Sequence, residues 1–310
     1  MADFDIHGIV NALHDVRRQW RAAHRPPGEP NGIAFPSLDA VADIVGQLKG
    51  VLFPMRLGPP CLRQDSENFH VAHALDSALH ALLVQVRIEL RYSAALRQLG
   101  STDIDGQALA AVRDFGAALP GIRQLLDSDV LAAYHGDPAA RSVDEVLLCY
   151  PGILAMIHHR LAHRLYALGL PLLARIVAEL AHGETGIDIH PGAQIGAGFF
   201  IDHGTGVVIG ETAVIGERVR LYQAVTLGAK RFPANADGTL QKGLARHPVL
   251  EDDVVIYAGA TLLGRITVGK GAVIGGNVWL THDVPPGARV AQAASRDDTA
   301  APGGDGLGGR

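Results

Sequence analysis

An acid and an imidazole stand side by side, followed by two glycines, in the segment Asp202-His203-Gly204-Thr205-Gly206. A further carboxylate, Asp188, lies 15 positions earlier in the chain. A carboxylate beside one imidazole nitrogen fixes the tautomer and stabilises the imidazolium, which is the chemistry of a general base. Spacing alone leaves an equal alternative, a surface histidine near an aspartate that has no catalytic role.

A second group of polar residues occurs at Arg246-His247-Pro248. Arginine offers a planar fork that suits a carboxylate, and an amino-acid substrate carries one. The alternative is a solvated loop arginine with a capping histidine. Glu211, in Gly210-Glu211-Thr212, is equally ambiguous between a site residue and a hydrogen-bonding residue at a corner.

The element that must position these residues has a six-residue period, which begins after Gly186. This period suits neither an α-helix nor a meander of hairpins. It is typical of a parallel β-helix, in which three hexads close a triangular coil of about 18 residues. Asp188 and His203 would then approach each other on neighbouring rungs. Two runs of buried positions follow the period: Ile189, Ile195, Ile201, Val207, Ala213, Val219 and Val225, then Leu250, Ile256, Leu262, Val268, Ile274 and Leu280.

The period breaks between the two runs, where residues 229–246 are predicted to form a loop outside the coil. Long loops on rigid scaffolds often carry function. A solenoid without chemistry remains the alternative for the repeats alone. Residues 293–310 lack periodicity and are expected to be a disordered tail.

Residues 1–185 have helical character. Apolar residues recur at helical spacing from Phe69 to Leu99, and prolines open two further helical runs, Pro151 to Leu168 and Pro171 to Ala181. The predicted fold class is therefore α+β, with an all-helical domain (1–185) followed by a parallel β-helix of hexapeptide repeats (186–292).

Composition excludes several classes of protein. Hydrophobic residues make up 48% and charged residues 19% of the 310 positions, which is typical of a folded chain. The formal charge of −5 gives no footprint for nucleic acid. The longest apolar stretch, Gly152 to Leu180, is interrupted by histidines and arginines, so no membrane span is expected. Two distant cysteines and an N-terminus without a basic region favour a reducing, cytoplasmic location.

The run GIDIHPGAQIGAGFFIDHGTGVVIGETAVIG (186–216), followed by YQAVTLGA and RHP, resembles serine O-acetyltransferase, a family of hexapeptide-repeat acyltransferases. The likeness covers about Asp137 to Pro286 and fits the form with an extended N-terminal helical domain. It implies left-handed β-helices in homotrimers, often paired into hexamers through the helical domains, with active sites between neighbouring β-helices. It also implies acetyl transfer from acetyl-CoA to the hydroxyl of L-serine, the first step of cysteine biosynthesis. Acetyl-CoA is then a substrate, and no cofactor or metal is expected.

The resemblance assigns roles residue by residue. His203 matches the catalytic base and Asp188 its partner. The serine-binding set is Asp137, Asp202, Glu211, Arg246 and His247, and the acetyl-CoA set is Ala229, Ala258, Gly276, Lys230 and Lys270. The alternatives are a helix N-cap for Asp137, coil packing for the three small residues and solvated charge for the lysines.

The resemblance further implies feedback inhibition by L-cysteine in the serine site. The chain ends Gly308-Gly309-Arg310, without the isoleucine that many members insert into the next enzyme, so that complex is not expected. Three rivals remain open. The first is an acyltransferase of the same fold acting on a sugar, homoserine or an amine, and the second is a purely structural solenoid. The third is a zinc-dependent hydratase with ligands drawn from His190, His203, His247 and His282.

Overall fold

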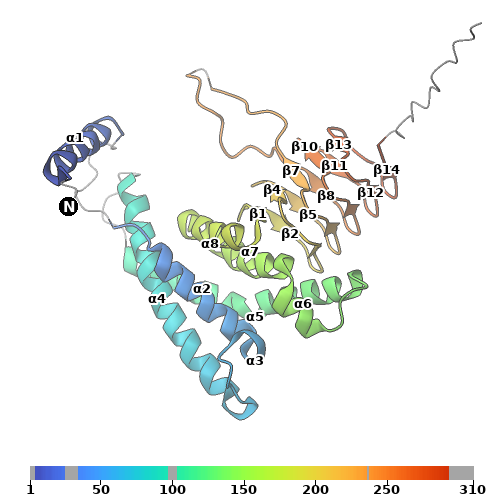
Figure 1. Ribbon diagram of the computed structural model, residues 1–310, viewed down its shortest axis with the longest axis horizontal. Coiled ribbons are helices and arrows are strands. Elements are labelled where there is room, and N and C mark those ends of the chain that lie inside the picture. Colours follow the sequence, from blue (N-terminus) through green and yellow to red (C-terminus); the bar gives the residue numbers. More distant parts are fainter. Residues whose placement is uncertain (1–3, 25–33, 97–102, 236, 293–310) are drawn as a thin grey trace, which may run out of the picture.

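The computed structural model describes residues 4–24, 34–96, 103–235 and 237–292. Helices occupy the first part of the chain and short strands the second (Figure 1). The predicted tail, 293–310, lies outside the described residues. The helices are α1 Ile6–His24, α2 Leu38–Leu52, α3 Pro54–Leu57, η1 Gln64–Ser66, α4 Glu67–Leu96, α5 Ile104–Gly136, α6 Val143–Cys149, α7 Pro151–Ala167 and α8 Pro171–Thr185.

The helices begin and end where local chemistry dictates. Ser37 and Ser142 cap α2 and α6 by accepting backbone N–H groups, and Pro151 and Pro171 occupy the first turns of α7 and α8. Gly186 ends α8 in the left-handed conformation that glycine adopts easily. The three predicted helical runs correspond to α4, α7 and α8.

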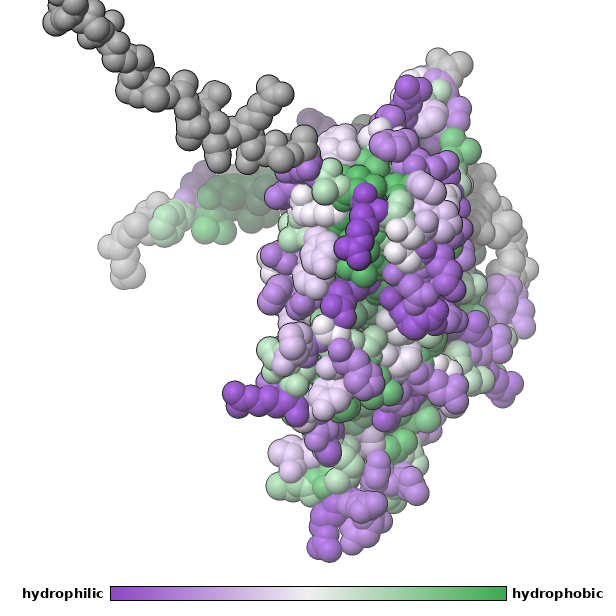
Figure 2. Space-filling view, turned by 90° about the vertical axis from the view of Figure 1, so that its right-hand side faces the viewer, coloured by the Kyte–Doolittle hydropathy of each residue, from purple (hydrophilic) through white to green (hydrophobic). Residues whose placement is uncertain are grey.

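No helix among the described residues is long and apolar enough to cross a membrane. Hydrophilic residues are spread over the face drawn in Figure 2, with smaller hydrophobic areas between them.

The second part of the chain is a parallel β-helix with three faces. Face A holds β1 Asp188–Ile189, β4 Val208–Ile209, β7 Thr226–Gly228, β10 Thr261–Leu263 and β13 Trp279–Leu280. Face B holds β2 Gln194–Ile195, β5 Val214–Ile215, β8 Val249–Leu250 and β11 Thr267–Val268. Face C holds β3 Phe200–Ile201, β6 Arg220–Leu221, β9 Val255–Ile256, β12 Val273–Ile274 and β14 Arg289–Val290.

The coils differ in length, and this corrects part of the predicted repeat. Thr261 pairs with Trp279, 18 positions on, but Asp188 pairs with Val208, 20 positions on. The two additional residues fall between Ile201 and Ile209. The first predicted run is therefore wrong in register after Ile201. Its later members do not stack on its earlier ones, because they occupy a second inward position of the hexad. That position is buried too, since each hexad points two side chains into the prism: Val207, Ala213, Val219 and Val225 are all fully buried, beside Ile209, Ile215, Leu221 and Leu227.

The predicted loop leaves the coil between β7 and β8, where Figure 1 shows it extending from the β-helix. Thr226 pairs with Thr261, 35 positions on, so the coil continues in register after the insertion. Within the loop, Ala234 and Leu240 form an antiparallel bridge.

A buried ion pair fastens the helices to the first coil. Arg160 of α7 binds both carboxylate oxygens of Asp129 in α5, at 3.0 and 3.1 Å from one guanidinium nitrogen. The same guanidinium donates to the carbonyls of Ile195 and Gly196, at 2.5 and 2.6 Å. Asp129 also accepts the N–H of Phe199, at 2.9 Å. Buried charges need such complete pairing, so the two parts of the chain are held in one arrangement here.

Candidate active site

The polar residues singled out above lie at the corners of the prism. The C–A corner, where face C turns into face A, carries residues 202–206 in the first coil. The A–B corner carries residues 190–193, 210–213 and the loop before β8. The remaining corner, B–C, carries residues 251–254 and 269–272.

At the C–A corner, the two-residue insertion pushes His203 out of the coil. His203 has a φ of 57°, and Gly204 and Gly206 have φ values of 87° and 78°, so three nearby residues adopt left-handed backbone. A Cβ at Gly204 would lie 2.4 Å from Ile187 Cδ1, so the turn requires glycine. The imidazole is 72% exposed, and its Nδ1 lies 3.8 Å from Oδ1 of Asp202.

The helical domain contributes Asp137 to the same corner. Its Oδ2 accepts a 2.5 Å hydrogen bond from the Tyr150 hydroxyl, and its Oδ1 accepts the N–H of Ala139 at 2.8 Å. These bonds lower the pKa of Asp137, with smaller contributions from the charges of His203 and Arg220. The same bond raises the pKa of Tyr150 to about 12. Asp137 is at the C-terminal end of α5, and α6 is capped by Ser142, so the N-cap alternative is wrong.

Sequence reasoning missed Tyr150. The available signal was its place immediately before Pro151, which opens α7. Its hydroxyl is what fixes the Asp137 carboxylate.

At the A–B corner, Arg246 and Glu211 form a close ion pair, with Nη2 2.6 Å from Oε2. The other oxygen of Glu211 accepts the hydroxyl of Tyr166 in α7, at 3.1 Å. Arg246 also donates from Nη1 to the carbonyl of Leu244, at 3.2 Å. Both partners of the ion pair are about a quarter exposed, so the pair lies at the surface edge of a packed cluster.

His247 is buried beside this ion pair. Its Nδ1 accepts the N–H of Thr212 at 3.0 Å and lies 2.9 Å from the Thr212 hydroxyl, so the ring proton belongs on Nε2. Burial, and then the charge of Arg246, lower the pKa of His247 to about 4. Gly210 packs against the ring so closely that a Cβ there would lie 2.1 Å from it. His247 is therefore neutral at pH 7.

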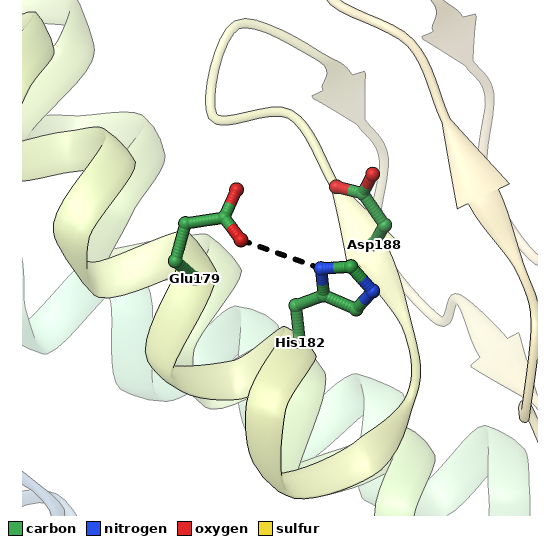
Figure 3. A group of neighbouring side chains, drawn as sticks. All are labelled: Glu179, His182 and Asp188. Atoms are coloured by element: carbon green, nitrogen blue, oxygen red, sulfur yellow. Dashed lines mark hydrogen bonds and ion pairs between the residues drawn. The ribbon is translucent and has the colours of Figure 1, made fainter.

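Asp188 occupies a different neighbourhood from the one predicted. It lies with Glu179 and His182 of α8, and the three potential ligand atoms are within 4.8 Å of one another (Figure 3). Among the described residues, the carboxylate at ion-pair distance from His203 is that of Asp202. The structure therefore does not show the direct contact between Asp188 and His203 that the spacing suggested.

The histidines required by a zinc hydratase do not form a cluster. Within the described part of the chain, the potential ligands that lie close enough together to share a metal ion are Glu179, His182 and Asp188, which include one imidazole. None of the four histidines named for that rival belongs to it.

The residues expected to bind acetyl-CoA divide between corners. Ala258 and Gly276 lie on successive coils of the C–A corner, the corner of His203, and the N–H of Asn277 bonds the Ala258 carbonyl at 2.8 Å. Ala229 and Lys230 begin the loop at the A–B corner. Lys270 lies at the B–C corner, 3.6 Å from Asp252 and 3.7 Å from Asp253, so the structure does not bring it to the other four.

His203 and Arg246 thus stand on opposite edges of face A. One chain assembles each half of the predicted site but does not bring the halves together. A heterologous interface between two copies would juxtapose one edge of each chain.

Residues 247–282 match the family model of the bacterial transferase hexapeptide (six repeats), in agreement with the six-residue period of the β-helix. The "Serine acetyltransferase, plasmid" of Synechococcus elongatus is 58% identical over 273 residues, 87% of this chain and 86% of that protein. The chain belongs to the serine acetyltransferase family.

Solved structures of serine acetyltransferases are similar to the chain over most of its length. Entamoeba histolytica serine acetyltransferase 1 in complex with L-cysteine has a TM-score of 0.70 at 34% identity, covering 92% of this chain and all of that one. Neisseria gonorrhoeae serine acetyltransferase in complex with serine has a TM-score of 0.53 at 29% identity, covering 82% and 97%. The predicted fold class, a helical domain followed by a left-handed parallel β-helix, is confirmed.

Proposed function

We propose that this serine acetyltransferase moves the acetyl group of acetyl-CoA directly onto the hydroxyl of L-serine, with His203 as the general base. The observation that carries the proposal is the exposed imidazole at the C–A corner. Its backbone is held in a left-handed turn, and carboxylates from both domains, Asp202 and Asp137, surround it. This arrangement favours the imidazolium that forms when the serine proton is taken.

The chemistry needs no covalent intermediate. His203 removes the hydroxyl proton as the serine oxygen attacks the thioester carbonyl, and the thiolate of CoA leaves and takes a proton from the same ring. Cys61 and Cys149 are both free and exposed, and neither lies in the repeat region, so neither suits an acyl-enzyme. Free thiols also agree with a reducing, cytoplasmic location.

The substrate carboxylate belongs to Arg246. Its guanidinium has five N–H donors, and the bonds to Glu211 and Leu244 occupy two of them. The remaining donors can bind a carboxylate through two parallel hydrogen bonds. Neutral His247 keeps its Nε2 proton and provides a further donor.

Because His203 and Arg246 occupy opposite edges of face A, the complete site is proposed to lie between two chains of a homotrimer. One chain supplies the base with Asp137, Asp202 and the more distant Asp188. Its neighbour supplies Arg246, His247 and Glu211. Pairing of two trimers through the helical domains would leave this arrangement unchanged.

Acetyl-CoA is proposed to follow the C–A corner past Ala258 and Gly276, where small residues leave room for a thin chain. Ala229 and Lys230 of the neighbouring chain would face it. Lys270 is proposed to contact the CoA phosphates only if it leaves Asp252 and Asp253.

L-cysteine is the proposed feedback inhibitor. It carries the same carboxylate and amine as serine, and solved relatives from Entamoeba histolytica contain it. Competition with serine in steady-state rates would support a shared site, and purely non-competitive inhibition would exclude it.

The test is a thiol-release assay with acetyl-CoA, run with L-serine, with homoserine and without acceptor. Serine-dependent release is expected, and His203→Ala should lower kcat by about 10²–10⁴-fold. His80→Ala is the matched control, because that imidazole is 74% exposed and also lies near an aspartate. Near-normal turnover by His203→Ala would remove it from the role, and a preference for homoserine would identify a different acceptor.

A further inference from the structure

We infer that Tyr166 is a positioning residue for serine: it directs the guanidinium of Arg246 through Glu211. The inference rests on the proposed role of Arg246 in holding the serine carboxylate. It also gives the helical domain a second part in the site, beyond Asp137.

Glu211 is held at both of its oxygens. Oε1 accepts the Tyr166 hydroxyl at 3.1 Å, and Oε2 accepts Arg246 Nη2 at 2.6 Å. A carboxylate fixed at one oxygen can still rotate about its side-chain bonds, whereas one fixed at both has a defined plane. The bond from Tyr166 therefore sets the direction in which Glu211 pulls the guanidinium.

Tyr166 is itself held in a fixed place. It belongs to α7, which Arg160 joins to the first coil through the carbonyls of Ile195 and Gly196. Between Arg160 and Tyr166 in the same helix, His163 donates from Nδ1 to the carbonyl of Pro191 at 2.8 Å. The Tyr166 ring meets the His190 ring edge-on, with centroids 5.7 Å apart. These contacts make α7 a rigid reference for the A–B corner.

Arg246, by contrast, ends a long irregular segment. Apart from the bridge between Ala234 and Leu240, the described residues of 229–248 form no strand between β7 and β8. The coil therefore does not position this side chain in the way it positions β-strand residues. The hydrogen bonds of Arg246 to Glu211 and Leu244, and of its N–H to Thr212 Oγ1 at 2.9 Å, replace that support. Only the bond to Glu211 leads back to the helical domain.

Protonation favours this arrangement at neutral pH. Burial raises the pKa of Tyr166, and its hydrogen bond to Glu211 raises it further, so the phenol remains a donor. Burial alone would raise the pKa of Glu211, but the bonds from Arg246 and Tyr166 outweigh it and the pKa is lowered. Glu211 is thus an ionised acceptor for both partners.

The experiment uses Tyr166→Phe in the full chain, with serine and acetyl-CoA varied independently. The variant loses the hydrogen bond to ionised Glu211, which positions Arg246 for the substrate. The KM for serine should therefore rise about tenfold. The kcat and the KM for acetyl-CoA should stay within about twofold. Tyr92→Phe is the matched control, since this half-buried tyrosine lies in α4, far along the chain from the site, and should change nothing.

A merely structural role predicts another pattern. It would lower the thermal midpoint and all kinetic parameters together, and that result would overturn the inference. The double variant Tyr166→Phe/Arg246→Ala adds a sharper readout. Its KM for serine should equal that of Arg246→Ala, because the tyrosine acts only through the arginine, and additive effects would also overturn the inference.

The outcomes separate this inference from the proposed function. An unchanged KM in Tyr166→Phe, with normal serine-dependent turnover, overturns the positioning role alone. Absence of serine-dependent turnover in the unmodified chain overturns the proposed function.

Discussion

The A–B corner and the C–A corner of the same prism are built in opposite ways. At the A–B corner, Arg246 donates to Glu211, which also accepts the Tyr166 hydroxyl, and the buried His247 accepts the N–H of Thr212. At the C–A corner, His203 is 72% exposed, and its nearest carboxylate partner stands 3.8 Å away. One half of the proposed site is complete within a single chain, and the other half is open.

The difference follows from what each half has to do. A group that holds a substrate gains from being fixed during folding, because no reorganisation is then needed when the substrate arrives. A general base must reach a proton on a substrate that, in the proposed arrangement, lies between two chains. The left-handed turn at 202–206 leaves His203 exposed at the C–A corner, where a neighbouring chain is proposed to complete the site.

The largest expected effect tests whether the two corners meet only between chains. With serine kept well below its KM, His203→Ala and Arg246→Ala are each expected to be nearly inactive, the first through a lowered kcat and the second through a raised KM for serine. When the two variants are mixed after unfolding and reassembled into trimers, about one site in four should combine an intact His203 with an intact Arg246 of its neighbour. Thiol release should therefore return to about a quarter of the normal rate, against about a hundredth or less for each variant alone.

The control is each variant unfolded and reassembled by itself, which must stay inactive. If the mixture remains as inactive as its components while forming trimers, both corners act within one chain. The C–A corner would then not need a neighbouring chain to complete the site.

The sequence predicted the repeats but not the phase of the first coil. A six-residue period predicts inward positions, and both Ile209 and Val207 are inward, so the shift of register at Ile201 left no trace in hydrophobicity. The insertion is visible only in pairing between coils, which is a long-range property. For the same reason, the spacing of Asp188 and His203 predicts a direct contact that the structure does not show.

The A–B corner shows a second limit of sequence reasoning. The sequence singles out Arg246, His247 and Glu211 as polar residues beside the repeats, and the family resemblance assigns their roles. Tyr166 lies 45 positions before Glu211, in the helical part of the chain, where no pattern links it to them. Helical periodicity places such a tyrosine in the packed face. Only the docking of α7 on the first coil shows that its hydroxyl reaches a carboxylate.

A second prediction tests the buried state of His247 through pH. The pKa of His247 is about 4 in the folded chain, whereas an unperturbed histidine has a pKa of about 6.5. Between these values the unfolded chain binds a proton that the folded chain does not, so the free energy of unfolding must fall as the pH falls. From pH 7.5 to pH 5 the loss from this residue should be on the order of 2 kcal/mol.

Denaturant titrations at several pH values, compared between the unmodified chain and His247→Asn, measure this contribution. Asparagine can still accept the N–H of Thr212 but does not titrate, so the variant should be less stable overall and less sensitive to acid. Identical pH slopes in the two proteins would mean that the ring is not buried in its neutral form.

A third prediction concerns the shape of the guanidinium rather than its charge. Arg246→Lys keeps a cation near Glu211 but cannot offer two parallel donors to a carboxylate. The KM for serine should rise about tenfold, and kcat should change little. Arg265→Lys is the matched control, because this nearby arginine donates to backbone carbonyls of Thr212 and His247 and not to the ion pair. An unchanged KM would assign the serine carboxylate to another residue.

The smallest expected effect lies at the open corner. Tyr150→Phe removes the 2.5 Å bond to Asp137, which is exposed enough for water to replace it. We expect kcat/KM for serine to fall only about threefold, since a solvated hydrogen bond contributes little in net terms. The effect should be smaller than that of Tyr166→Phe, because Glu211 is the more buried of the two carboxylates. A larger loss in Tyr150→Phe than in Tyr166→Phe, measured in the same assay, would show that the C–A corner is as firmly organised within one chain as the A–B corner.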